Sequence, residues 1–442
     1  MAFGHYQNEP LFLSTDSHQF IMGSSRSGKG VCLIIPHLLR YEGSAFVLDP
    51  KGENAKATGR HRATLNAQVH YLDPFGITGK PPSRFNPLAA MTPENMEEEA
   101  NALATALVFG EGAQHDHWTD SAQQLLATFI LYVYASPAIP PHRKDLPTMR
   151  RLLLSRTKEE LTTMRDDPDH QALAGGLLSA LAASFLATPP GEQGSIFSTA
   201  HRQTAILDNR PLAATLAAEG TTPAVTFADW HAHTMTVYLC LSAPRFPVFN
   251  RWLRLVLTAA LNEMTTVLRP PPLPVSFVLD EIASLSHLQV IENAVGLAAG
   301  YGVQILSVWQ DTAQMRELYK GRWASFINNA GVRAVFSIND YDSADYWSKF
   351  VGSRVIETTS HQRDMYGVDR GHSTGETLRP LWTSDELMLE FARTKSLAER
   401  PEVGRPPDEM LVLVEGARPF TAQRIPYFHD RTLDGLWDDP RV

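Results

Sequence analysis

Hydrophobic and polar positions follow a repeated strand–helix order at both ends of the chain. Short apolar runs typical of buried strands lie at residues 18–22, 44–48 and 68–72, and residues 29–40 carry helical spacing. After residue 196 further strands are predicted at 235–241, 275–279, 303–308, 333–338 and 410–414. This order predicts an α/β fold with a mainly parallel twisted sheet and helices on both faces.

The stretch from residue 91 to residue 195 has a different character. Alanine, leucine and glutamate dominate it, and it contains 14 acidic residues but only 7 lysines and arginines. We therefore predict an acidic, all-helical insertion between a first α/β part, 1–90, and a second, 196–442. Its acidic surface is either a protein-docking face or an ordinary solvated helical face, and the sequence favours neither.

The remaining segments are read from their composition. Residues 358–380 are polar and without periodicity, which predicts a loop, and 268–274 form a Pro-rich connector. Two uncharged stretches, 121–142 and 171–191, are long enough to test as membrane spans, but both are interpreted as core helices. The chain starts without the pattern of a signal peptide.

Composition removes several classes of protein. A net charge of −9 excludes a wholly basic nucleic-acid coat protein but leaves room for a local basic channel. Two cysteines exclude a disulfide scaffold and a Cys-rich zinc site. The His-x-His pairs at 115–117 and 231–233 supply only two ligands each, so no zinc site is predicted.

The strongest chemical signal is a glycine-rich segment between a predicted strand and a predicted helix. Such a loop binds nucleotide phosphates through backbone N–H groups and the helix N-terminus. Lys29 is expected to reach the β- and γ-phosphates, whereas Gly30 replaces the hydroxyl residue that usually helps hold Mg²⁺. The structural alternative is a turn without a ligand. The predicted binding residues are Gly23, Ser24, Ser25, Arg26, Ser27, Gly28, Lys29, Gly30 and Val31.

Acidic and polar residues follow three other predicted strands. Asp280 is predicted to support Mg²⁺ and Glu281 to orient or deprotonate the attacking water; the alternative for Asp280 is a helix cap. Gln310 is a candidate sensor of the γ-phosphate, or an ordinary turn residue. Asp49 either joins the Mg²⁺ shell or belongs to a turn built by Pro50 and Gly52.

Taken together, these motifs resemble the type IV coupling proteins, the TraG branch of the conjugation and type IV secretion ATPases. The resemblance covers most of the chain, although 91–200 lacks a sharp motif, and glycine at position 30 recurs in that family. The matching segments are Gly28–Val31, Ile35–Leu39, Leu48–Glu53, Leu72–Phe75, Phe85–Leu88, Leu279–Leu285, Ala299–Gly302, Gln310–Gln314, Arg379–Leu387 and Leu411–Tyr427.

The resemblance implies a RecA-like nucleotide-binding domain, formed by 1–90 and 196–442, with the all-α domain inserted. It implies ATP and Mg²⁺ as cofactors and a hexameric ring at the cytoplasmic face of the bacterial inner membrane. Its partners would be inner-membrane secretion components and single-stranded DNA carrying a relaxase, or protein effectors. Relatives usually begin with membrane helices. This chain is therefore expected to be either a cytosolic fragment or a naturally soluble form, and a monomer is one expected state of it.

One expected component has no clear match. Some relatives carry an arginine just before the Gly-Tyr-Gly-like segment, where this chain has Ala298 and Ala299. Arg333 is the candidate for a trans-acting arginine.

Two functions stay open at this point. One is an ATP-driven motor, and the alternative is a nucleotide-gated substrate receptor with little hydrolysis of its own.

Overall fold

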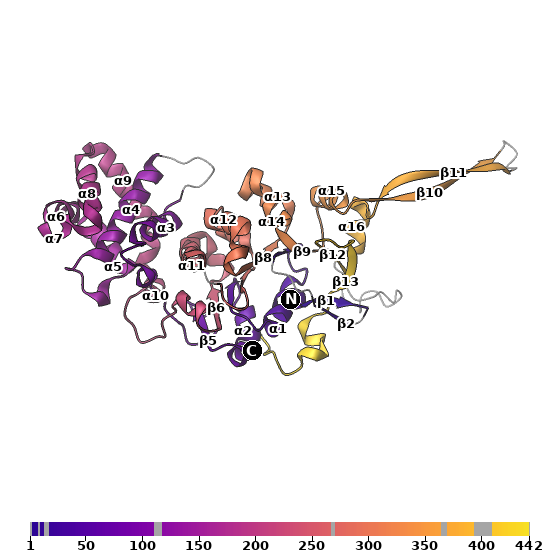
Figure 1. Cartoon of the computed structure of the whole chain (residues 1–442), viewed down its shortest axis with the longest axis horizontal. Coiled ribbons are helices and arrows are strands. Elements are labelled where there is room, and N and C mark those ends of the chain that lie inside the picture. The colour runs from indigo at the N-terminus through magenta and orange to yellow at the C-terminus, as the bar shows by residue number, and fades with distance from the viewer. Residues whose placement is uncertain are drawn as a thin grey trace. The chain divides into compact units, whose positions relative to one another are not determined.

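The computed structural model describes residues 2–7, 9–12, 17–109, 117–266, 270–363, 369–392 and 409–441. The chain forms two compact units (Figure 1). Unit 1 contains Met1–Arg40 and Leu306–Asp434, and unit 2 contains Tyr41–Ile305 and Gly435–Val442. Each unit is therefore assembled from two separate stretches of the chain.

Unit 1 is built on a mixed sheet. The central strand β3 (His18–Met22) is fully buried and runs parallel to both of its neighbours, β8 and β9. The outer strands pair in antiparallel fashion. The strand order is β2 (Glu9–Phe12), β1 (Ala2–Tyr6), β13 (Phe420–Gln423), β12 (Glu409–Val414), β9 (Ala330–Val335), β3, and then β8 (Val303–Trp309), which crosses the unit boundary.

Helices accompany this sheet in the order that the sequence predicts. The chain after β3 turns into a five-residue π-helix, Gly30–Ile34, which continues as α1 (Ile35–Arg40). The later helices of the unit are α13 (Thr312–Tyr319), α14 (Ser325–Asn328), α15 (Tyr341–Phe350) and α16 (Ser384–Glu390).

A long two-stranded ribbon corrects the prediction of a loop at 358–380. Strands β10 (Ser353–Arg363) and β11 (Asp369–Pro380) pair in antiparallel register and extend away from the rest of unit 1 (Figure 1). The rung Val355–Leu378 is exposed, and Glu357 faces Glu376 on the next rung of the same face. Because neither face packs on a core here, the segment lacks the apolar alternation by which strands are recognised.

Strand β9 also differs from its predicted range, 333–338. It ends at Val335 because the backbone leaves the strand conformation soon afterwards: Ser337 has a φ of +50°. The backbone of Phe336 and Ser337 instead contacts the end of β3 and the loop that follows it.

Unit 2 holds a four-stranded parallel sheet of order β7 (Val275–Leu279), β4 (Ala45–Asp49), β6 (Met235–Cys240), β5 (Gln68–Leu72). Strands β4, β6 and β7 are buried along their whole length, as expected for strands covered on both faces. Phe46 and Phe277 stack with ring centroids 5.3 Å apart in this core. Helices α2 (Glu53–Leu65), α11 (Phe246–Thr266) and α12 (Gln289–Leu297) belong to the same unit.

A group of helices lies between β5 and β6 in the chain (Figure 1). The described residues within 91–195 form helices and no strand, as predicted, and the helices continue to residue 215. The predicted boundaries at 90 and 195 stay predictions. The helices are α3 (Met96–Leu107), α4 (His117–Ala135), α5 (Leu146–Ser155), α6 (Thr157–Asp166), α7 (Pro168–Gln171), α8 (Leu177–Ala187), α9 (Pro190–Gln203) and α10 (Arg210–Thr215).

Within the described residues, no helix taken singly has the length and apolar character needed to cross a membrane. The segments Leu173–Ala187 and Pro190–Gln203, bent by 120° at their junction, meet that requirement of length and composition only as a pair.

Candidate nucleotide-binding site

The glycine-rich loop leaves the carboxyl end of β3 and is fixed by backbone hydrogen bonds to neighbouring segments of unit 1. Gly23 N donates to Trp309 O at 3.1 Å and Ser24 N donates to Ser337 O at 3.3 Å. The chain then turns through two left-handed positions, Arg26 (φ +60°) and Gly28 (φ +95°). An arginine in that region is uncommon, and such strained backbone clusters at ligand sites. The sequence motif thus forms a turn shaped like a phosphate-binding loop.

Lys29 lies against the inside of this turn. Its Nζ donates to the carbonyl oxygens of Gly23, at 2.5 Å, and Ser24, at 3.0 Å. An ammonium group at this place can exchange those carbonyl oxygens for the more strongly charged oxygens of a phosphate. The geometry therefore fits the role predicted for Lys29.

The helix after the loop begins in an unusual way. The π-helix Gly30–Ile34 follows Lys29 directly, and π-helical turns are frequent at functional sites. The first N–H groups of a helix have no partner within the helix, so they are available to an anion. A Cβ atom added to Gly30 would find no other atom within 4 Å, so glycine is not required there by space.

Two of the predicted residues of unit 1 meet across the loop. Ser25 Oγ donates to Gln310 Oε1 at 3.1 Å, which places the predicted phosphate sensor against the loop. Gln310 follows β8, and its backbone N donates to Gln314 Oε1 at 3.3 Å. The carboxyl ends of neighbouring parallel strands, where ligands gather in such sheets, thus bring these side chains together.

Arg424 is a residue of this site that the sequence analysis missed. It follows β13, is 2% exposed, and its Nη1 donates to Ser27 O at 2.7 Å. Its guanidinium carbon lies 4.4 Å from the centre of the Phe336 ring, which packs beside Gly23. A buried guanidinium therefore holds the loop backbone at Ser27. No local pattern in the sequence marks this contact, because 397 residues separate Arg424 from Ser27.

The predicted acidic pair lies in unit 2, directly after β7. Asp280 is partly exposed, and Glu281 adopts a left-handed conformation with a φ of +66°. Ser284 N donates to Glu281 O at 2.9 Å and closes the turn. A glutamate in this conformation carries backbone strain, which is typical of residues whose side-chain direction matters.

Asp49 lies at the end of β4 in the same unit. Its Oδ2 accepts from Ala55 N at 2.8 Å and its Oδ1 from Lys51 N at 3.4 Å, and Gly52 takes the left-handed conformation of a turn. Burial, opposed by these hydrogen bonds but assisted by Asp280, raises the pKa of Asp49 to about 7. This geometry favours the turn interpretation, and the Mg²⁺ role of Asp49 stays a prediction.

Arg333 is engaged within its own unit. Its Nε donates to Ile327 O at 2.7 Å, at the end of α14, and its guanidinium faces the Phe350 ring. Burial lowers its pKa. A trans-acting role would require the side chain to leave these contacts, and it stays a prediction.

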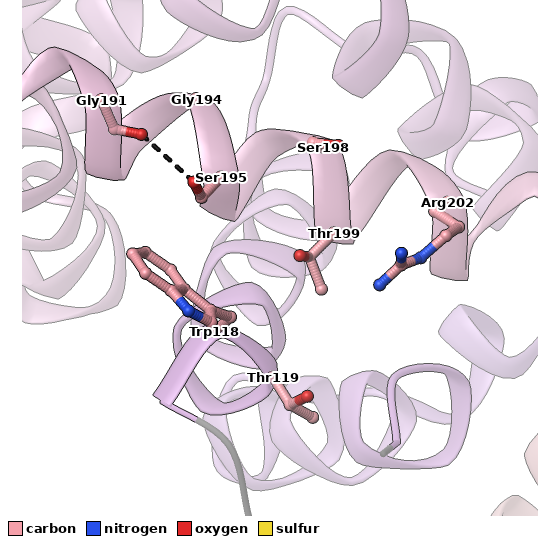
Figure 2. A pocket seen from close by; sticks show the side chains of 8 residues that line it. All are labelled: Trp118, Thr119, Gly191, Gly194, Ser195, Ser198, Thr199 and Arg202. Carbon is pink, nitrogen blue, oxygen red and sulfur yellow. Dashed lines mark hydrogen bonds between the residues drawn. The ribbon is translucent and has the colours of Figure 1, made fainter. Parts of the chain in front are cut away.

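A surface pocket of about 500 Å³ lies among the helices of unit 2, between the start of α4 and α9 (Figure 2). Trp118 and Arg202 are among its lining residues, and Ser195 Oγ donates to Gly191 O at 3.2 Å. None of the predicted site residues lines this pocket. The pocket therefore carries no part of the nucleotide hypothesis.

Comparison with known proteins agrees with the motifs. The family model described as Type IV secretory system Conjugative DNA transfer matches residues 1–439. Protein VirD4 of Rhizobium radiobacter is 24% identical over 455 residues, which cover 99% of this chain and 60% of that protein. Conjugal transfer protein TraG of Agrobacterium fabrum is 26% identical, over 84% of this chain and 56% of that protein. The chain therefore spans about 60% of the length of the curated relatives it matches.

Solved structures show the same fold. An unbound form of the bacterial conjugative coupling protein TrwBdeltaN70 has a TM-score of 0.65 at 15% identity and covers 95% of this chain and 87% of that one. The plasmid coupling protein TrwB in complex with ADP and Mg²⁺ has a TM-score of 0.58, also at 15% identity, over 93% and 86% of the two chains. The fold is thus a RecA-like phosphate-loop fold with an inserted group of helices, as predicted.

Proposed function

Because the chain belongs to the Type IV secretory system Conjugative DNA transfer family, we propose that it is an ATP-driven coupling protein of such a system. It recruits DNA–relaxase complexes or protein effectors and delivers them to the secretion channel. The observation that carries this proposal is the loop of unit 1, where Lys29 and the Ser25–Gln310 pair lie on a turn shaped for phosphates.

The loop residues Gly23 to Val31 hold the phosphates of ATP in this proposal. Lys29 contacts the β- and γ-phosphates, and Gln310 senses whether the γ-phosphate is present through its hydrogen bond to Ser25. Arg424 keeps the Ser27 carbonyl in place, so the inner surface of the loop is fixed before the nucleotide arrives.

Two carboxylates that follow β7 are assigned the cation and the water in this proposal. Asp280 is assigned to Mg²⁺ because it is partly exposed at the end of β7, whereas Asp49 is buried. The bound cation would neutralise developing charge on the phosphates. Glu281 orients or deprotonates the attacking water, and Arg333 is retained as the candidate that acts on a neighbouring subunit's nucleotide.

The working assembly in this proposal is a homo-hexamer at the cytoplasmic face of the bacterial inner membrane. Its partners are the inner-membrane components of the secretion system and the transported cargo, single-stranded DNA with its relaxase or protein effectors. A trans-acting arginine makes hydrolysis depend on assembly, and assembly depends on protein concentration.

A second function, a nucleotide-gated substrate receptor with little hydrolysis, is favoured by one observation. Gly30 stands where a Ser or Thr hydroxyl usually helps to hold Mg²⁺, so the cation has one protein ligand fewer. In this version nucleotide binding would control recruitment, and turnover would be slow.

The test is ATP hydrolysis measured over a range of protein concentrations, with and without single-stranded DNA. Turnover per subunit that rises with protein concentration and with DNA supports the motor. Tight ATP binding without turnover supports the receptor.

Lys29→Ala is the negative control, and Lys158→Ala, an exposed lysine on α6, is the matched control. Turnover unchanged in Lys29→Ala would refute the assignment of the site. Equal loss in both lysine variants would show a general effect of the substitution.

A further inference from the structure

An arginine–aromatic stack lies at the carboxyl edge of the unit 2 sheet. The guanidinium carbon of Arg245 lies 3.7 Å from the centre of the Phe75 ring, and the rings of Phe75 and Phe249 are 5.2 Å apart. Arg245 is exposed, whereas both phenylalanines are partly exposed. A flat cation on an aromatic ring thus presents its outer face to solvent.

The stack belongs to a continuous surface formed by three loops. Strands β4, β6 and β5 are parallel neighbours, so the loops that follow them meet at one edge. A Cβ atom added to Gly52 would lie 3.3 Å from Ile77 and Thr78, so the two loops run close together. Arg245, which follows β6, covers Phe75, which follows β5. These contacts fix the three loops against one another.

Positive charge predominates on this surface. The β4 loop carries Lys51, 67% exposed, the β5 loop carries Lys80, and the β6 loop carries Arg245. The acidic residues nearby are Glu53, which lies 4.0 Å from Lys51, and the buried Asp49 and Asp73. Asp73 is already occupied, since it accepts from Ile77 N and Thr78 N. The surface therefore carries three exposed or partly exposed cations and one exposed carboxylate.

Within the described part of the chain, Arg245 is held by its contact with the Phe75 ring and not by an ion pair. It ends the short 3₁₀ helix Ala243–Arg245 and directly precedes α11, whose first turn holds no acidic residue. Among the residues that the structure describes, no carboxylate lies within ion-pair distance of Arg245. The charge of Arg245 and the outer face of its guanidinium are therefore left for a ligand that carries negative charge or a π-face.

We propose that this surface, defined by Lys51, Phe75, Lys80, Arg245 and Phe249, binds single-stranded DNA. Lysines contact the phosphates, and a base stacks on the Arg245 guanidinium and against the edge of Phe75. Aromatic and guanidinium planes bind bases without sequence preference because every base has a π-face, and basic residues follow the backbone. The inference rests on the proposed function. It assigns residues that contact the cargo, which the sequence analysis did not identify.

The test is the binding of a fluorescein-labelled oligothymidylate to the whole chain, measured by anisotropy at several salt concentrations. Arg245→Gln is expected to weaken binding roughly tenfold and to reduce the slope of log Kd against log salt by about 1. Arg245→Lys keeps the charge and is expected to keep the slope while losing severalfold in affinity. Phe75→Leu preserves the packing volume and is expected to weaken binding without changing the slope.

A matched control is Arg60→Gln, an exposed arginine of α2 that pairs with Asp438 at 2.8 Å in the same unit. The inference is overturned if Arg245→Gln and Arg60→Gln bind DNA equally well. A second measurement, 2-aminopurine fluorescence in the oligonucleotide, reports stacking directly. Quenching that survives in both Phe75→Leu and Arg245→Gln also overturns it.

Binding of an ATP analogue distinguishes failure of the DNA-binding surface from failure of the proposed function. The Arg245 and Phe75 variants are expected to bind a fluorescent ATP analogue as the parent chain does. If the parent chain binds the analogue but no DNA, the stacking surface and DNA as cargo both fail while the nucleotide site stands. If Lys29→Ala binds the analogue normally, the proposed function fails whatever the DNA result.

Discussion

At the scale of single residues, the conformation of a few loop positions decides what the site can hold. Gly28 needs its left-handed φ of +95°, and a Cβ at Gly23 would lie 2.9 Å from Phe336 O. Gly30 has neither constraint. Packing and backbone conformation therefore do not require glycine at position 30, and a hydroxyl residue would fit there.

Gly30→Ser is expected to fold and to bind nucleotide more tightly in the presence of Mg²⁺. The new hydroxyl adds one ligand, worth about 1 kcal/mol or roughly fivefold in affinity. The free energy of unfolding is expected to change by less than about 1 kcal/mol. Titration of a fluorescent ATP analogue with Mg²⁺ and with EDTA measures the effect, and Gly23→Ser, expected to disrupt the loop, is the matched comparison. Weaker Mg²⁺-dependent binding in Gly30→Ser would contradict this view of position 30.

Asp49 gives the molecule a defined pH dependence. Burial raises its pKa from 3.8 to about 7, so the folded chain keeps a proton that the unfolded chain releases. The stability from this proton is complete below pH 3.8 and is lost as the pH rises to about 7. Between pH 5 and 7 the loss is roughly 2–3 kcal/mol.

Asp49→Asn removes this titration while keeping an oxygen that can accept from Ala55 N. The variant is therefore expected to gain stability relative to the parent chain as the pH rises from 5 to 8. Urea denaturation at the two pH values measures the difference. A stability difference that is the same at both pH values would show that Asp49 ionises normally in the folded chain.

At the scale of elements, a strand far along the chain stabilises the phosphate loop. Arg424, just after β13, donates a hydrogen bond to Ser27 O in the loop, and its guanidinium packs on the Phe336 ring. Arg424→Met is expected to reduce the free energy of unfolding by about 2–4 kcal/mol, since it removes a buried charge-assisted hydrogen bond. Nucleotide affinity is expected to fall with it.

Arg418→Met serves as the control, because Arg418 is exposed on the turn between β12 and β13. Urea denaturation and nucleotide titration of the two variants separate loop support from a general effect of lost charge. Equal nucleotide affinity in both variants would mean that the loop holds its shape without Arg424.

Strands β3, β5 and β7 coincide with their predicted ranges. Strands β3 and β7 are fully buried and lie inside the sheet, where short apolar runs bounded by turn residues are typical, whereas β5 is a partly buried edge strand. The ribbon β10–β11 escaped prediction because it buries no face. The Ser25–Gln310 and Ser27–Arg424 contacts join residues 285 and 397 positions apart, a distance at which local patterns carry no information.

At the scale of the whole molecule, nucleotide binding and folding of unit 1 are linked. A ligand that binds only the folded state, at 100 times its Kd, stabilises it by about 2.7 kcal/mol. ATP with Mg²⁺ is therefore expected to raise the melting temperature of unit 1 by roughly 5–11 °C, since each kcal/mol shifts a unit of this size by about 2–4 °C. Thermal denaturation of the parent chain and of Lys29→Ala measures this shift. A shift of equal size in both proteins would place the nucleotide elsewhere.

The order of the chain has a consequence for biosynthesis. Strand β3 pairs with β8 and β9, and 285 residues separate Ser25 from Gln310. A ribosome that adds about 5–20 residues per second needs roughly 15–60 s for that interval. During this time unit 2 is translated up to Ile305, while the apolar residues of the nascent β3 still have neither parallel neighbour. The phosphate loop is therefore translated about 285 residues before the strand end that completes it.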